Sequence, residues 1–139
     1  MSSSREREEF VLGTVRDALN QREFSRWISE QPPEMPLGVS SAPGSCPIAK
    51  YLFTKCGVEA EVDNEFASVR GVGRVFLPLW AQRFVLSVDL LGGIVDADLA
   101  GRVLDWHQGL HGRRLSRGRV VLESALLYLR VHICRAGRR

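Results

Sequence analysis

The sequence lacks any long hydrophobic run and has few cysteines. Its longest strongly apolar stretches fall well short of the roughly 20 residues that a membrane-spanning helix needs. The start, MSSSREREEF, lacks the apolar core of a signal peptide. Three cysteines are an odd number and form no disulfide framework, which agrees with a reducing compartment. We therefore expect a cytoplasmic protein that does not enter membranes.

Sequence motifs for catalysis or ligand binding are also missing. Gly71-Val72-Gly73 has neither the GK[ST] ending of a P-loop nor the βαβ context of a dinucleotide fingerprint. His107 and His111 have the i,i+4 spacing of zinc ligands, but Gly109 and Gly112 disfavour a helix there. We find no zinc-finger pattern, no helix-turn-helix spacing and no aromatic-basic strand of the RNA-binding type. The sequence predicts no metal ion, no cofactor and no enzymatic activity.

The composition is that of a globular domain with an uneven charge distribution. Among 139 residues, 45% are hydrophobic and 25% are charged, which suits one domain with its own core. Residues 1–101 carry ten basic and fourteen acidic side chains, whereas residues 102–139 carry nine arginines and two acidic residues. The two ends of the chain therefore carry opposite charge. The seventeen arginines against two lysines suit phosphate or carboxylate contacts, or reflect a GC-rich genome.

Three segments are expected along the chain. Residues 1–31 form an N-terminal helical segment, either one kinked helix or two short ones, with caps at Ser3 and Asn20. Residues 32–44 are rich in proline and glycine and have no periodicity, which predicts a linker or loop. Residues 45–139 form a compact α+β core that ends in a basic helix and tail.

The core is predicted to surround the helix of residues 79–91, which is apolar on most of its circumference. Before it, residues 47–56 form a helix whose buried stripe includes Phe53. Residues 58–63 alternate as a half-exposed strand, and residues 66–77 return as one bulged strand or two shorter ones. Asp96 caps a later helix. The predicted fold is a helix-rich α+β domain in which a β-hairpin or three-stranded antiparallel sheet packs against this buried central helix.

Two groups of residues are candidates for binding. An apolar trio precedes the proline-rich segment and becomes an exposed anchor for a partner if the N-terminal helices are loosely tethered: Phe24, Trp27 and Ile28. A basic surface could contact phosphates, stay solvated or meet an acidic protein surface: Arg113, Arg114, Arg117, Arg119, Arg130 and Arg135. The acidic strand face that includes Glu59 and Glu61 could meet these arginines in the same or a neighbouring chain.

Cys46 is the most enzyme-like residue, because it lies at the predicted N-terminus of a helix. Backbone N–H groups there stabilise a thiolate and lower the pKa of the thiol. A nucleophile would also need a base, and His107 near Asp105 is conceivable.

The leading hypothesis is a small non-catalytic interaction module, an accessory or regulatory protein that docks on a larger protein partner or on itself. The first alternative is an arginine-dependent accessory protein that binds nucleic acid. The second is a cysteine-dependent enzyme that uses Cys46.

Overall fold

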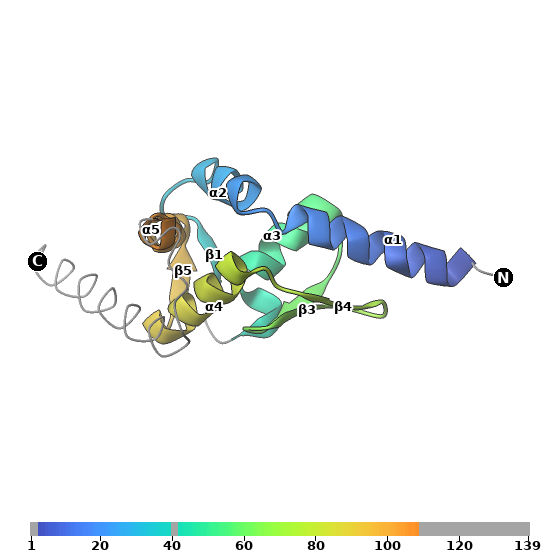
Figure 1. Ribbon diagram of the computed structural model, residues 1–139. Coiled ribbons are helices and arrows are strands. Elements are labelled where there is room, and N and C mark those ends of the chain that lie inside the picture. The colour runs from blue at the N-terminus through green and yellow to red at the C-terminus, as the bar shows by residue number, and fades with distance from the viewer. Residues whose placement is uncertain (1–2, 40–41, 109–139) are drawn as a thin grey trace, which may run out of the picture.

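The computed structural model describes residues 3–39 and 42–108. Within them, helices combine with two small antiparallel sheets, which confirms the predicted helix-rich α+β class (Figure 1). The helices are α1 Ser3–Ala18, α2 Gln21–Ser29, the 3-10 helix η1 Pro43–Ser45, α3 Pro47–Cys56, α4 Leu79–Leu91 and α5 Ala97–Gln108. The strands are β1 Pro36–Val39, β2 Ala60–Val62, β3 Phe66–Val69, β4 Gly73–Phe76 and β5 Ile94–Asp96.

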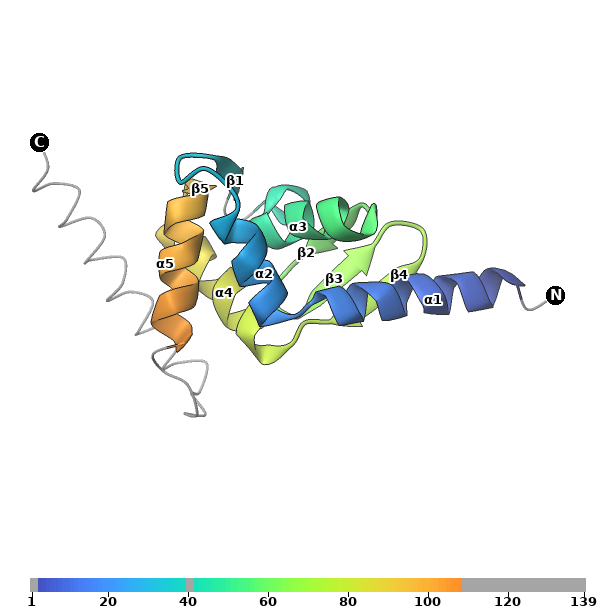
Figure 2. The same ribbon diagram turned by 90° about the horizontal axis from the view of Figure 1, so that it is seen from above.

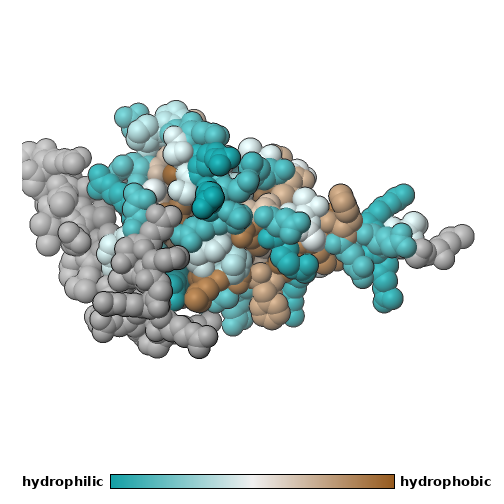
Figure 3. Space-filling view, turned by 45° about the horizontal axis from the view of Figure 1, so that its top comes forward, coloured by the Kyte–Doolittle hydropathy of each residue, from teal (hydrophilic) through white to brown (hydrophobic). Residues whose placement is uncertain are grey.

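The two sheets lie at opposite ends of the folded body. Helices α3 and α4 occupy its middle, with the three-stranded sheet on one side and the β1–β5 pair with α5 on the other (Figure 2). Helix α1 projects away from the body, and its N-terminal end is covered mainly by hydrophilic side chains (Figure 3). None of the described helices is long and apolar enough to cross a membrane.

The N-terminal region folds as two helices, one of the two arrangements expected. The Oδ1 of Asn20 accepts the N–H of Glu23 at 3.2 Å, so the cap starts α2 and separates it from α1. Val15 of α1 is fully buried, and α1 packs against β4 and α3. The Tyr51 hydroxyl of α3 donates to the carbonyl O of Ala18 at 2.7 Å. This bond satisfies a carbonyl at the C-terminal end of α1, where no intrahelical partner exists.

The expected apolar anchor is part of the core instead. Phe24, Trp27 and Ile28 are only 0%, 7% and 4% exposed. The Phe24 ring lies 5.1–6.0 Å, centroid to centroid, from four aromatic rings: those of Trp27, Tyr51, Trp80 and Phe84. Helix α2 also packs against α5. An exposed anchor would require loosely tethered N-terminal helices. These helices are instead packed on the core, and burial of the aromatic rings removes a large apolar area from water.

Part of the expected linker is a strand. β1 pairs antiparallel with β5, with Val39 opposite Ile94, and a register shift lies between Pro36 and Gly38. The shift breaks the alternation that would have indicated a strand, and only Leu37 of β1 is buried. A Cβ atom on Gly38 would collide with the carbonyl O of Ser45 and lie 2.8 Å from the carbonyl carbon of Cys46. Glycine at this position therefore lets β1 lie directly against the start of α3.

The three-stranded sheet follows the predicted alternation. Its order is β2-β3-β4, and Phe66–Val69 and Gly73–Phe76 form two separate strands, the second of the two alternatives. The Oδ1 of Asp63 accepts the N–H groups of Glu65 and Phe66 at 2.7 and 2.6 Å, which closes the β2–β3 turn. Ala60 and Val62 point into the core, and Glu61 between them is exposed.

The central helix α4 is less buried than predicted. Ala81, Phe84, Val85, Val88 and Leu91 face the core, but Leu79 and Leu90 are exposed, because α4 has packed elements on only part of its circumference. The helix of residues 97–108 begins as predicted, with the Leu99 N–H donating to Asp96 Oδ1 at 2.8 Å.

Truncating Phe24 tests the packing of this core. Phe24→Ala should lower the free energy of unfolding by about 3–5 kcal/mol, the range for removing a buried phenylalanine ring. Phe10→Ala is the matched control, because Phe10 is 75% exposed, and it should cost less than about 0.5 kcal/mol. Urea unfolding followed by tryptophan fluorescence measures both. Equal effects of the two substitutions would contradict the placement of Phe24.

Candidate partner-binding groove

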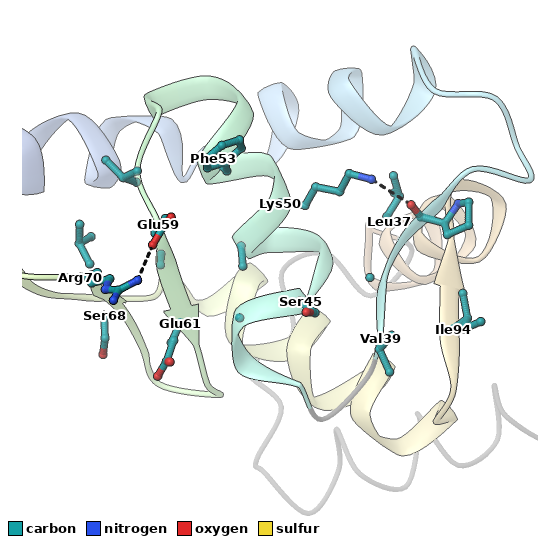
Figure 4. A pocket seen from close by; sticks show the side chains of 17 residues that line it. Leu37, Val39, Ser45, Lys50, Phe53, Glu59, Glu61, Ser68, Arg70 and Ile94 are labelled. Atoms are coloured by element: carbon teal, nitrogen blue, oxygen red, sulfur yellow. Dashed lines mark hydrogen bonds and ion pairs between the residues drawn. The ribbon is translucent and has the colours of Figure 1, made fainter.

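A groove with a volume of about 1100 Å³ separates the two sheets. Its walls come from β1 and β5 on one side and from β2 and β3 on the other, with η1 and α3 between them. Figure 4 shows Val39 and Ile94 on the first wall, Glu61 and Ser68 on the opposite wall, and Ser45 between the walls. Segments far apart in the sequence therefore meet at one surface.

Short local features hold the groove in shape. Pro47 occupies the first turn of α3, and the Cys46 Sγ atom accepts the Ala49 N–H at 3.4 Å, so α3 starts directly after η1. Pro36 has no N–H to offer at the outer edge of β1, and its carbonyl O accepts a hydrogen bond from Lys50 Nζ at 3.1 Å. The two sheets thus stay separate, with α3 spanning the space between them.

Three exposed apolar side chains line this groove. Val39, Phe53 and Ile94 are 44%, 59% and 67% exposed, and they come from β1, α3 and β5. Phe53 was expected in the buried stripe of its helix, and that prediction is wrong. Tyr51 fills the core position instead, because α3 turns its Tyr51 side toward Phe24.

Four charged side chains line the groove, and three of them have a hydrogen-bond or ion-pair partner: Lys50, Glu59 and Arg70. Glu59 and Arg70 form an ion pair with 3.0 Å between Oε2 and Nη1, and Lys50 donates to the Pro36 carbonyl O. Glu61 is exposed and has no partner among the described residues. The groove therefore combines apolar walls with one uncompensated carboxylate.

A second aromatic cluster lies on the outer face of the three-stranded sheet, where Phe76 is exposed and Phe66 is half-buried. Phe66 and Phe76 are opposite each other in the ladder, with ring centroids 4.4 Å apart. The Arg74 guanidinium lies 4.4 Å from the centre of the Phe66 ring, a cation–π contact. These three side chains contact one another, and none of them lines the groove.

Cys46 does not have the environment expected of a nucleophile. It caps α3 as predicted, but it is only 4% exposed. Burial raises the pKa of the Cys46 thiol to about 11, because desolvation outweighs the hydrogen bonds from the backbone. The expected lowering of this pKa is therefore wrong. His107 contacts Ser87, while His111 and His132 lie outside the described residues.

The remaining predicted site residues are not placed by the structure. The basic surface of Arg113, Arg114, Arg117, Arg119, Arg130 and Arg135 lies entirely outside the described residues. Within residues 3–39 and 42–108, no group of three or more His, Cys, Asp or Glu side chains could hold a metal ion.

Ser87 and His107 form a buried polar pair between α4 and α5. The Ser87 hydroxyl donates to the Arg83 carbonyl O at 2.8 Å, so the neutral imidazole donates from Nε2 to Ser87 Oγ, 2.7 Å away. The His107 Nδ1 atom then carries the lone pair and has no partner among the described residues. Burial, with a smaller effect from the nearby Arg83 charge, lowers the pKa of His107 to about 4.

Comparisons with protein-family models, with curated proteins and with solved structures find no match to this chain.

The depressed pKa of His107 predicts a pH-dependent stability. An unfolded histidine has its ordinary pKa near 6.5, so between pH 6.5 and 4 the unfolded state binds more protons than the folded state. His107 should therefore stabilise the fold fully above pH 6.5 and lose that contribution as the pH falls. Urea unfolding at pH 7.5, 6.5 and 5.0 should show a loss on the order of 1–2 kcal/mol that His107→Gln lacks. Parallel pH profiles of the two proteins would contradict a buried neutral imidazole.

Proposed function

We propose that this protein is a non-catalytic interaction module that binds a segment of a protein partner in the groove between the two sheets. The observation that carries the proposal is that Val39, Phe53 and Ile94, all exposed, line one groove. Scattered apolar side chains on a surface need no explanation, but apolar side chains gathered in a concave surface are typical of binding sites.

The separate walls of the groove, rather than its volume, support a polypeptide. Small-molecule pockets have volumes of about 300–1,000 Å³, close to that of this groove. A groove of about 1100 Å³ that runs from β1 to β3 can accept several side chains of one segment. Exposed apolar anchors within such a groove are the feature that contributes most of the affinity in protein interfaces.

The non-catalytic part of the proposal is supported by Cys46. An attacking thiol must be ionised and accessible, whereas this thiol is buried and its pKa is raised to about 11. We include a cytoplasmic location in the proposal, since Cys46 and Cys56 are free cysteines.

A protein partner fits the described residues better than nucleic acid does. Residues 3–39 and 42–108 carry eleven basic and fifteen acidic side chains. Phosphate backbones require a basic surface, so support for nucleic-acid binding rests on arginines outside the described residues.

Selection of peptides on the full chain tests this function. Random peptides displayed on phage should converge on sequences that bind the immobilised wild-type protein. Phe53→Asp should weaken their binding at least tenfold, because it puts a carboxylate at an apolar contact. Phe10→Asp is the matched control, since Phe10 is exposed on α1 outside the groove, and it should leave binding unchanged. Circular dichroism checks that both variants are folded.

Three results would contradict the proposal. The first is a lack of convergent sequences, and the second is equal binding of selected peptides to wild-type and Phe53→Asp protein. The third is a wild-type dimer, seen by analytical ultracentrifugation, that Phe53→Asp dissociates and Phe10→Asp does not. That dimer would make a second copy the occupant of the groove.

A further inference from the structure

The partners of the charged side chains in the groove indicate which chemistry the occupant must have. Lys50 is engaged by the Pro36 carbonyl O, and Arg70 by Glu59, at 3.1 and 3.0 Å. Each positive charge thus has an acceptor within the protein. Glu61 is the one charged side chain lining the groove that has no partner among the described residues. As far as residues 3–39 and 42–108 show, the uncompensated charge of the groove is therefore negative.

The register of the sheet explains why no basic side chain lies directly opposite Glu61. Glu61 lies opposite Ser68 of β3, and Ser68 lies opposite Arg74 of β4. Arg70, two residues after Ser68, lies beside Glu59 and pairs with it. A basic side chain directly opposite Glu61 would have paired with it across the ladder. Ser68 is neutral, and the Arg74 guanidinium lies against the Phe66 ring.

On the basis of the proposed function, we infer that the groove binds an apolar and basic peptide segment, with an apolar side chain against Val39 and Ile94 and a lysine or arginine facing Glu61. The two contacts lie on opposite walls of the groove, as Figure 4 shows. A segment that crosses the groove can present its side chains to both walls. The apolar contact supplies most of the affinity, and the carboxylate selects the sign of the charge.

A second copy of this chain is the competing occupant, because the chain has a net charge of +3 and residues 113–139 carry eight arginines. A wild-type dimer that Phe53→Asp dissociates would identify the second copy as the occupant.

The magnitude of the charge effect is limited by exposure. An exposed ion pair contributes about 0.2–1 kcal/mol and a like-charge contact costs a similar amount, so a basic peptide should bind about five times more tightly than its acidic counterpart. Salt screens exposed charges, so this ratio should shrink at high ionic strength. The apolar contribution should change little with salt.

Two fluorescein-labelled peptides measure this preference on the full chain. Both alternate valine with a charged residue over ten positions, one with lysine and the other with glutamate. Fluorescence anisotropy at 50 mM salt should give a Kd about fivefold lower for the lysine peptide. Glu61→Gln should remove most of the preference, and Glu61→Arg should reverse it. Glu8→Arg, an equal charge change on an exposed residue of α1, should leave the preference intact.

The outcomes separate this inference from the proposed function. Equal binding of both peptides to wild-type protein, with both weakened by Phe53→Asp, would overturn the charge selection and leave the groove as a binding site. A preference that Glu8→Arg abolishes as fully as Glu61→Arg would also overturn it, because net charge alone would then explain the result. A third outcome is that neither peptide binds, although the same protein binds phage-selected peptides through Phe53. That outcome would overturn the inferred chemistry of the occupant.

Discussion

The packing of aromatic rings around Phe24 is the contact on which the rest of this structure depends. It joins α2 to Tyr51 of α3 and to Trp80 and Phe84 of α4. With α2 held against α3, α4 and α5, the segment after it runs back to pair with β5 and becomes one wall of the groove. The core and the candidate site are therefore coupled, because loss of the aromatic packing would release the segment that carries β1.

The groove exists because the two sheets do not join. Pro36 and the register shift in β1 disfavour another strand at its outer edge, and the Lys50 bond to the Pro36 carbonyl satisfies an acceptor there. Gly38 allows β1 to lie against Ser45 and Cys46, at the start of α3, and residues of η1 and α3 line the groove between the two walls. The wall with Val39 and Ile94 then faces the wall that carries Glu61. We assign the affinity to the apolar contact with Val39 and Ile94 and the charge selection to Glu61 on the opposite wall. Neither contribution requires a reactive group.

The sequence predicted the parts of this fold that depend on local patterns. Asn20 capped a second helix, the alternation around Glu61 indicated a strand, and Asp96 capped the helix of residues 97–108. It failed where long-range packing decided the outcome. β1 and β5 are short and irregular, so the sequence shows no alternation of apolar and polar residues in them. Phe24, Trp27 and Ile28 could not be placed without knowing which elements α2 packs against.

The candidate site was accessible to sequence reasoning only in part. The acidic face of Glu59 and Glu61 was identified as a contact surface, but its opposite wall of Val39 and Ile94 was not. Phe53 was assigned to the core because it fits the same helical stripe as Leu52, and only the tertiary packing of Tyr51 distinguishes them. Gly38 between two apolar residues was a local signal of close backbone approach, although the backbone that approaches it, residues 45–47, could not be identified from spacing.

The most direct test of the central claim, that a polypeptide segment binds between the two sheets, is a titration followed by ¹H–¹⁵N correlation spectra. The lysine–valine peptide is added to the ¹⁵N-labelled full chain, and perturbed amide signals are mapped on the structure. A segment bound between the sheets should perturb amides on both walls and between them, at Gly38, Val39, Phe53, Glu61 and Ser68. Perturbations confined to the Phe66–Phe76 face, or saturating binding that leaves the groove amides unchanged, would contradict it.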